Sequence, residues 1–238
     1  MNFLLHRHLA ARDLGSAAAG FGAMLPDLWR ILDRRVRAVR DPLPHVSERD
    51  AVAELEAGIQ HHLDADEWFH DAPVFLEGER ATASALQAAE LEARHSVMFA
   101  HVLWELCLDG ALVLHEGEAQ VREELREGLD ACSGLLPAAA HRHHFARVAR
   151  TEDDRARFDE RLERVSRDLV VGSWALGYAS GAGLAVRVDG MRRRLNLLPM
   201  GERDVGALAR VAEARLADAR GVVKTILASP PVHRIAAS

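Results

Sequence analysis

Long stretches rich in Ala, Leu, Glu and Arg run through almost the whole sequence, and they limit what the chain can fold into more than any other feature. These residues have high helix propensity, and runs of alternating β-branched residues joined by hairpin turns, which are typical of β-strands, are absent. Apolar residues make up 49% of the chain, enough to build a core and to exclude disorder throughout. We therefore predict an all-α protein that folds as a single compact helical bundle domain over residues 1–238.

Residues that cap or break helices set the expected bounds. Pro26 predicts a kink or a break, because proline removes a backbone donor and clashes with the preceding turn, and Gly110 is expected to stop a long helix. The uncharged segment Leu169–Val186 is interpreted as a buried helix rather than a membrane span, because glycine and serine lower its hydrophobicity. The expected helices cover about Asn2–Asp13, Ser16–Val39, Ser47–His70, Thr82–Asp109, Glu116–Ala131, Pro137–Arg150, Glu152–Gly183 and Glu202–Ala228.

Charge and cysteine content narrow the function classes. The formal net charge of −6 argues against a general nucleic-acid binder, so we expect no nucleic-acid partner. Cys107 and Cys132 are the only cysteines and form no CxxC pair, which excludes a disulfide scaffold and a thiolate zinc finger. This usage suits a reducing compartment, and the expected localisation is the cytoplasm.

Two stretches place histidine and carboxylate side chains at positions i, i+4 and i+8, so that each set shares one helix face. The two sets are His62, Asp66 and His70, and His101, Glu105 and Asp109. Facing helices that carry such residues can build a metal site in the core of a bundle. Imidazole with carboxylate oxygens, and without thiolate, favours Mn, Fe, Zn or Mg over a soft metal.

The length of each set limits how it can bind. Eight residues of helix span ~12 Å, so one ion cannot contact all three side chains of a set. Either an adjacent pair holds one ion, or two ions ~3.5–4 Å apart share the two sets, and the remaining side chains orient the ligands. The alternative for both sets is a solvated face or a structural network of ion pairs.

The N-terminal third adds further candidates. On a helix His6 and His8 point about 200° apart, so only one of them can face a given site. Asp27 follows Pro26 in an apolar stretch, where a carboxylate needs a partner; its alternative role is to cap the helix after the break. A further histidine-rich stretch, residues 141–144, is interpreted as a solvated helix start or loop.

Four segments then form a pattern that is moderately specific when taken together. They are Asn2-Phe3-Leu4 with His6 and Leu9-Ala10, Gly22 to Asp27 with Arg30, Gly58-Ile59 with His62 and Asp66, and Trp104-Glu105 with Leu108. This pattern resembles the bacterial acyl carrier protein phosphodiesterases over about the first half of the chain. The chain departs from that family at His70, where the family has Asp, at Glu105-Leu106, where it has Asp-His, and at His101, where another acid is expected. The run Met24-Leu25-Pro26-Asp27 is also similar to zinc-dependent phospholipase-C-like proteins.

The resemblance implies a helical fold related to the HD-type metal phosphohydrolases. It also implies hydrolysis of the phosphodiester that joins phosphopantetheine to a carrier-protein serine, with acyl carrier protein as partner and Mn as the expected ion, and Fe, Zn or Mg as alternatives. The expected metal ligands are first His6, Asp27, His62 and Asp66, then His70, His101 and Glu105, as ligands or as residues that orient them.

In that scheme Asp27 and Asp66 take part in catalysis, and Arg30 neutralises the phosphate. Two alternatives stay open. One is a non-catalytic helical protein with structural histidine–carboxylate networks, and the other is a metal phosphohydrolase that acts on a different phosphoester.

Overall fold

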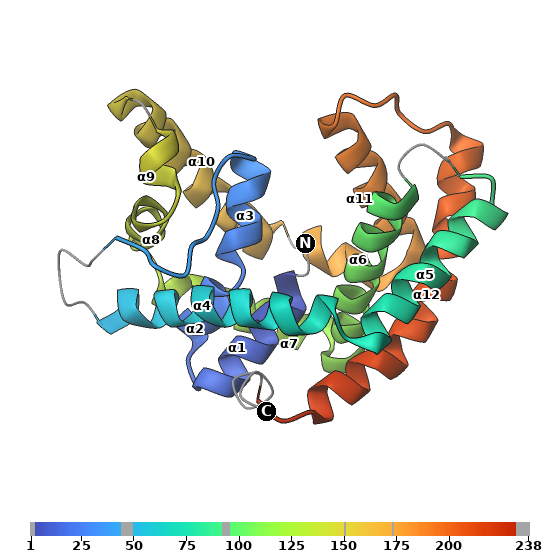
Figure 1. The fold of residues 1–238 in the computed structure, drawn as a ribbon, viewed down its shortest axis with the longest axis horizontal. Coiled ribbons are helices and arrows are strands. Elements are labelled where there is room, and N and C mark those ends of the chain that lie inside the picture. Colours follow the sequence, from blue (N-terminus) through green and yellow to red (C-terminus); the bar gives the residue numbers. More distant parts are fainter. Residues whose placement is uncertain (1–2, 44–49, 92–95, 150, 173, 232–238) are drawn as a thin grey trace. The chain divides into compact units, whose positions relative to one another are not determined.

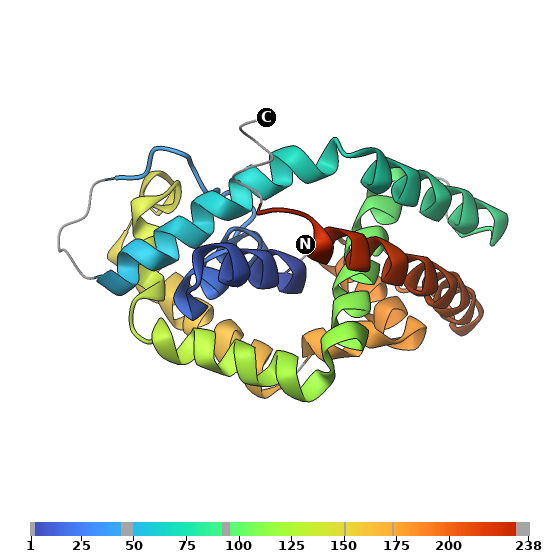
Figure 2. The same cartoon turned by 90° about the horizontal axis from the view of Figure 1, so that it is seen from below.

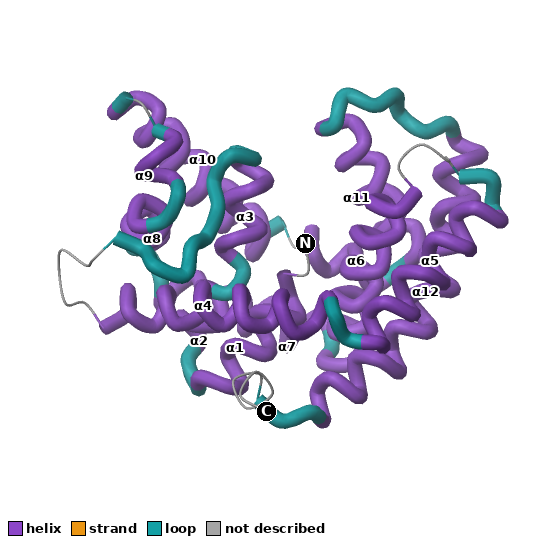
Figure 3. The backbone as a smooth tube through the Cα atoms, in the orientation of Figure 1, coloured by secondary structure: helices purple, strands orange, loops and turns teal. Residues whose placement is uncertain are grey.

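The computed structural model describes residues 3–43, 50–91, 96–149, 151–172 and 174–231. Every regular element in these ranges is a helix and none is a strand (Figure 3), so the prediction of an all-α protein is confirmed. Asn2 and Ser47, which open two of the predicted helices, lie outside the described residues. The elements are α1 (Phe3–Leu14), α2 (Ala17–Gly22), α3 (Leu25–Leu32), α4 (Asp50–His70), α5 (Pro73–Ala88), α6 (Ser96–Glu116), α7 (Glu118–Ala131), α8 (Leu136–Arg142), α9 (Phe145–Val148), α10 (Glu152–Val171), the 3₁₀-helix η1 (Trp174–Ala179), α11 (Gly181–Arg194) and α12 (Glu202–Ala228).

The helices group into two compact units. Among the described residues, the first unit consists of Phe3–Trp68 and Ala119–Trp174, and the second unit consists of Phe69–Glu118 and Ala175–Ser229. Helix α4 lies in the first unit except for its last two residues, which belong to the second. The single domain expected from the sequence stays a prediction.

Within the first unit, two glycines let the backbones of α2 and α4 touch. A Cβ atom on Gly58 would lie 1.9 Å from the carbonyl oxygen of Ala19, and one on Gly22 would lie 2.3 Å from the carbonyl oxygen of Leu55. Only glycine leaves room for such an approach. Helix α1 also packs against α2 (Figure 2), so the two close approaches hold the middle of α4 near α1.

Within the second unit, α6 and α12 pack against each other, and both pack against α5 and α11 (Figure 1). Residues Met98–Glu116 of α6 are, in the described part of the chain, the one helical stretch long and apolar enough to cross a membrane, but 78% of that stretch is buried inside the protein. A core helix meets the same criteria, so this is weak evidence for a span. Gly110 does not stop the helix as predicted: a Cβ atom there would lie 2.0 Å from the carbonyl oxygen of Tyr178, so the glycine allows η1 to approach α6.

The predicted helix Thr82–Asp109 is wrong, because α5 ends at Ala88 and α6 begins at Ser96. Glu90 follows the end of α5 with a φ of 56°, in the left-handed region that ends a helix. Glutamate is otherwise a good helix former, so the sequence carries no sign of this break.

The predicted helix Glu152–Gly183 is also interrupted. Helix α10 ends at Val171, η1 follows, and the hydroxyl of Ser180 caps α11 by accepting a hydrogen bond from the Gly183 N–H. The interpretation of Leu169–Val186 as one buried helix is therefore wrong, and the Val171 side chain is 79% exposed.

Proline acts as predicted near the start of the chain. Helix α2 ends at Gly22 and α3 begins at Leu25 with Pro26 in its first turn, so the predicted break is confirmed. The predicted end of this helix at Val39 is wrong, because α3 ends at Leu32 and Asp33 has an extended backbone. The predicted helix Pro137–Arg150 is divided into α8 and α9, whereas the helix predicted over Glu202–Ala228 is confirmed.

Candidate metal centres

The side chains of His6, His62 and Asp66 meet in the first unit; we call these three residues the Asp66 cluster. Nε2 of His6 lies 3.0 Å from one carboxylate oxygen of Asp66, and Nε2 of His62 lies 3.3 Å from the other. One ligand atom from each residue lies within 4.8 Å of the other two. That spacing allows a single metal ion to bind all three residues at once.

The hydrogen bond of the His62 Nδ1 atom determines which ring nitrogen faces Asp66. Its Nδ1–H donates to the carbonyl oxygen of Ala23 over 2.8 Å. A neutral imidazole has one N–H, so its Nε2 then carries a lone pair that points at the negative Asp66 carboxylate. A lone pair and a carboxylate repel each other, so the arrangement calls for a positive charge between them, either a proton on His62 or a metal ion.

The proton affinities of the Asp66 cluster reflect this crowding in the metal-free protein. Burial and the neighbouring His62 lower the pKa of His6, against the opposing effect of Asp66. Burial also disfavours charge on His62, but the hydrogen bond to Asp66 and the charges of Asp27 and Asp66 raise the pKa of His62 overall. Burial alone would raise the pKa of Asp66, whereas hydrogen bonds from the two histidines hold it far below its usual value. The cluster therefore favours a bound positive charge over an added proton on the carboxylate.

Two further predicted site residues lie on α3. The carboxylate of Asp27, in the first turn, is near enough for its charge to raise the pKa of both His6 and His62. Asp27 is nevertheless not one of the three residues whose ligand atoms converge. Arg30, in the last turn of the same helix, is exposed.

The side chains of His70, His101 and Glu105 meet in the second unit and form what we call the Glu105 cluster. Nε2 of His70 lies 3.3 Å from Oε1 of Glu105, and Nε2 of His101 lies 3.5 Å from the same oxygen. Ligand atoms of these three residues also lie within 4.8 Å of one another. The ring of Phe75 packs 4.9 Å from the ring of His70 and 5.2 Å from that of His101, centre to centre, which restricts both imidazoles.

A second carboxylate holds the outer side of His101. Its Nδ1–H donates to Oε1 of Glu79 over 3.1 Å. His101 thus lies between two carboxylates, and a neutral ring can donate to only one of them. As at His62, the second nitrogen of the ring faces a carboxylate oxygen, so a proton or a metal ion fits between them.

The pKa shifts of the Glu105 cluster have the same causes. The hydrogen bond to Glu105, together with the charges of Glu105 and Glu79, raises the pKa of His101 against the effect of burial. Burial alone would raise the pKa of Glu105, but nearby positive charge and hydrogen bonds from His101 and His70 hold it well below its usual value.

The two clusters divide the residues of the predicted helix faces in a way that the sequence did not indicate. His62 and Asp66 stay together, but His70, the third residue of their set, lies with Glu105. His101 and Glu105 stay together, whereas Asp109 is fully buried and belongs to neither cluster. Each cluster therefore uses an adjacent pair on one helix and recruits its second histidine from another element.

Glu79 is the residue that sequence reasoning missed. The predicted helix began at Thr82, which left Glu79 outside any element, whereas α5 begins at Pro73. Proline is favoured in the first turn of a helix, and Pro73 is the signal that could have extended the prediction to Glu79.

Three other histidines of the first unit each pair with one carboxylate. The pairs are His61–Asp13, His141–Asp159 and His143–Glu56. His143 shows how such a pair satisfies a neutral ring: Nδ1 accepts from the Val39 N–H over 3.1 Å, and Nε2–H donates to Glu56 over 2.9 Å. His143 is only 2% exposed, so the interpretation of residues 141–144 as a solvated stretch is wrong for this residue.

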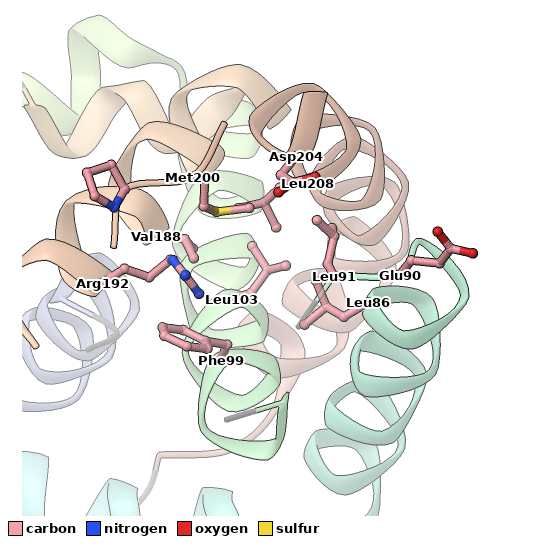
Figure 4. A pocket seen from close by; sticks show the side chains of 11 residues that line it. Leu86, Glu90, Leu91, Phe99, Leu103, Val188, Arg192, Met200, Asp204 and Leu208 are labelled. Atoms are coloured by element: carbon pink, nitrogen blue, oxygen red, sulfur yellow. The ribbon is translucent and has the colours of Figure 1, made fainter. Parts of the chain in front are cut away.

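The second unit also contains a cavity of about 110 Å³ (Figure 4). Apolar side chains form most of its lining, among them Leu86, Phe99 and Leu208. The guanidinium of Arg192 lies 5.5 Å from the centre of the Phe99 ring. None of the six clustered side chains lines this cavity, which suits a small apolar group rather than a metal ion.

Comparison with protein-family models, curated proteins and solved structures finds no match to this chain.

Proposed function

We propose that the protein is a metal-dependent phosphodiester hydrolase with an HD-like helical fold, and that the Asp66 cluster holds its divalent cation. The resemblance makes Mn²⁺ the first candidate, and Fe²⁺, Zn²⁺ and Mg²⁺ are the alternatives. The observation that carries the proposal is the orientation of His62, whose Nδ1–H is bound to the Ala23 carbonyl while its Nε2 faces Asp66. In structural pairs such as His143–Glu56, the ring donates to its carboxylate instead.

The composition of the cluster favours a reactive centre over a closed structural one. Two imidazoles and one carboxylate leave coordination positions for water and substrate, as in catalytic zinc sites. The Asp66 side chain is 36% exposed, so small molecules can reach that side of the cluster, whereas both histidines are buried. A divalent cation in such a position polarises a phosphoryl oxygen and makes a water molecule more acidic.

Two neighbouring residues have roles in this proposal. The half-buried Asp27, whose charge acts on both histidines, would accept a proton from the attacking water. Arg30 would bind the phosphate from the solvent side, since its side chain is exposed. Both assignments extend the resemblance stated above.

The proposed substrate class is a phosphodiester like that between phosphopantetheine and a carrier-protein serine, with acyl carrier protein as the partner. The support is the resemblance of the opening segment and of the segment from Gly58 to Asp66, together with the meeting of His6, His62 and Asp66 in one cluster. The cytoplasm is the proposed location.

A hydrolysis screen tests this proposal. The purified protein is stripped of metal, supplied with Mn²⁺, Fe²⁺, Zn²⁺ or Mg²⁺, and offered phosphomonoesters, phosphodiesters and holo-carrier protein. We expect Asp66→Asn to lower diester hydrolysis by about a hundredfold or more, the scale of losing one electrostatic contact to a transition state. Asp64→Asn, on the same helix but outside the cluster, is the matched control and should keep its activity.

The alternative function is a non-catalytic helical protein whose histidine–carboxylate clusters serve only stability. A protein that binds none of the four metals and hydrolyses none of the esters would establish that alternative. If the protein hydrolyses only monoesters, the proposed metal centre is supported and the proposed diester substrate is rejected.

A further inference from the structure

We propose that the Glu105 cluster is a second divalent-cation site, which takes Zn²⁺ or a similar ion, and that Glu79 positions His101 within it. This goes beyond the proposed function, which requires only the Asp66 cluster. The second site would bind its ion whether or not the protein hydrolyses a phosphodiester.

The geometry of the ligand atoms is the first argument. Two imidazole nitrogens from different elements approach one oxygen of Glu105, at 3.3 Å for His70 and 3.5 Å for His101. The Glu105 side chain is 5% exposed, so its carboxylate is a buried oxygen ligand held in place beside the two imidazoles. Both histidines are about one-third exposed, so a cation can enter from the imidazole side.

The hydrogen bonds of His101 are the second argument. Nδ1 lies 3.1 Å from Oε1 of Glu79 and Nε2 lies 3.5 Å from Oε1 of Glu105. In the neutral ring with Nδ1–H donated to Glu79, Nε2 is free to bind a cation beside Glu105 in place of a proton. A histidine held by a carboxylate on one side and directed at a metal on the other is a recurring arrangement in zinc proteins, where the outer carboxylate sets the tautomer and strengthens the ligand. Glu79 fits that positioning role, because it contacts only the outer nitrogen of the ring in the bonds described.

The donor set defines the class of ion. Two imidazole nitrogens and one carboxylate oxygen suit Zn²⁺, Co²⁺ and related transition metals, whereas Ca²⁺ and Mg²⁺ prefer shells made of oxygen. Phe75 packs against both rings and keeps them in place without adding a ligand.

The test is the number of ions bound by the metal-free full chain. The probes are Zn²⁺ and Co²⁺ in equilibrium dialysis followed by elemental analysis, and the visible absorption of bound Co²⁺ reports a nitrogen-containing site. We expect two ions for the unaltered protein, one for Asp66→Asn, one for Glu105→Gln and none for the double variant. Glu77→Gln, on the exposed side of α5, is the matched control and should leave two ions bound.

Two further variants cover the case in which the buried Glu105 cannot be changed without unfolding. His101→Ala, at a residue that is one-third exposed, should also remove one ion while circular dichroism shows a folded protein. Glu79→Gln should keep the site but lower its affinity for the ion by about 10–100-fold, because the variant loses only the carboxylate that orients His101. If His101→Ala and Glu105→Gln both retain two ions, or if the unaltered protein binds a single ion that only Asp66→Asn removes, the second site is rejected.

The two proposals fail in different ways. If every variant keeps its diester hydrolysis, the proposed function is rejected, but the number of ions bound by the Glu105 cluster is unaffected. An unchanged ion count in Glu105→Gln and His101→Ala would reject the second site while leaving hydrolysis at the Asp66 cluster intact.

Discussion

The Asp66 cluster and the Glu105 cluster contain the same types of residue, but a different residue type is exposed to solvent in each. In each, a histidine and a carboxylate four residues apart on one helix are joined by a second histidine, and two Nε2 atoms face one carboxyl group. In the Asp66 cluster both histidines are buried and the carboxylate is 36% exposed. In the Glu105 cluster the carboxylate is 5% exposed and the histidines about one-third. The i, i+4 spacing thus selects the ligands, whereas the packing around them decides which ligand a solvent molecule can reach.

The two clusters also differ in the group that binds Nδ1 of the histidine four residues before the carboxylate. His62 donates to a backbone carbonyl, that of Ala23, and His101 donates to the carboxylate of Glu79. A carboxylate makes the imidazole a stronger electron donor than a neutral carbonyl does. The Glu105 cluster is therefore the one whose ion affinity a single side-chain change, at Glu79, can adjust without touching a ligand.

The glycines beside the two clusters give the largest expected difference in stability. In Gly58→Ala the new Cβ would lie 1.9 Å from the Ala19 carbonyl oxygen, and backbone must move. In Gly78→Ala it would lie 2.1 Å from the indole of Trp104, a buried side chain rather than backbone. We expect chemical denaturation to show a loss of about 3 kcal/mol or more for Gly58→Ala and about 1–3 kcal/mol for Gly78→Ala.

Gly221→Ala is the control for both substitutions. This glycine lies inside α12, and a Cβ built there would meet no atom within 4 Å beyond its chain neighbours and the surrounding helix backbone. The substitution should stabilise the protein by up to about 1 kcal/mol through helix propensity. Equal losses at Gly58 and Gly78 would contradict the claim that the first unit depends on direct backbone contact between α2 and α4.

The histidines of the two clusters should titrate differently in the metal-free protein. The pKa of His6 is lowered by burial and by His62, whereas the pKa of His62 is raised by Asp66 and Asp27, so these two should titrate on opposite sides of the usual value near 6.5. The pKa of His101 is raised by Glu105. Imidazole proton shifts followed by NMR over pH 5–9 measure all three.

The consequence for stability follows from linkage. A histidine with a raised pKa contributes stability that is fully present below about pH 6.5 and is lost as the pH rises through its folded-state pKa. His101 and His62 both behave in this way, while the lowered pKa of His6 removes stability as the pH falls through 6.5. His101→Ala should therefore flatten the loss of stability above pH 6.5, and His6→Ala should flatten the loss below it. Unchanged pH profiles in both variants would contradict the assignment of charge within the clusters.

The sequence predicts what is local in this fold and misses what depends on packing. Helix propensity was sufficient for the all-α class, and the spacing of His62 with Asp66 was sufficient to place them together, because both are set within one helix. The break at Glu90 was missed, since a left-handed glutamate leaves no mark in the composition. His70 was placed with Asp66 by spacing, yet it contacts Glu105, because the partner of a residue at a helix end depends on what packs there.

The second histidine of each cluster is the clearest case of this limit. His6 became a candidate through a resemblance and not through its spacing, since it lies on α1 while its partners lie on α4. The helix contact that brings them together depends on Gly58, whose role is visible only once Ala19 is seen against it. Non-local ligands of this kind require the packing itself.

The smallest effects are expected at Asp64 and His8, which are close in sequence to residues of the Asp66 cluster but do not belong to it. Asp64 is two residues from both His62 and Asp66, and its carboxylate pairs with Arg40 at a site where both side chains are more than one-third exposed. An exposed pair of this kind contributes under about 1 kcal/mol, so Asp64→Asn should change the melting temperature little and the bound metal not at all. His8→Ala should likewise keep the metal, whereas His6→Ala should lose it, because His6 alone of the two reaches Asp66 in the contacts described. Elemental analysis of the four variants, Asp64→Asn with Asp66→Asn and His8→Ala with His6→Ala, measures this directly. If Asp64→Asn or His8→Ala releases as much metal as its partner variant, the ion is not held by the Asp66 cluster, and the contrast between the two clusters fails with it.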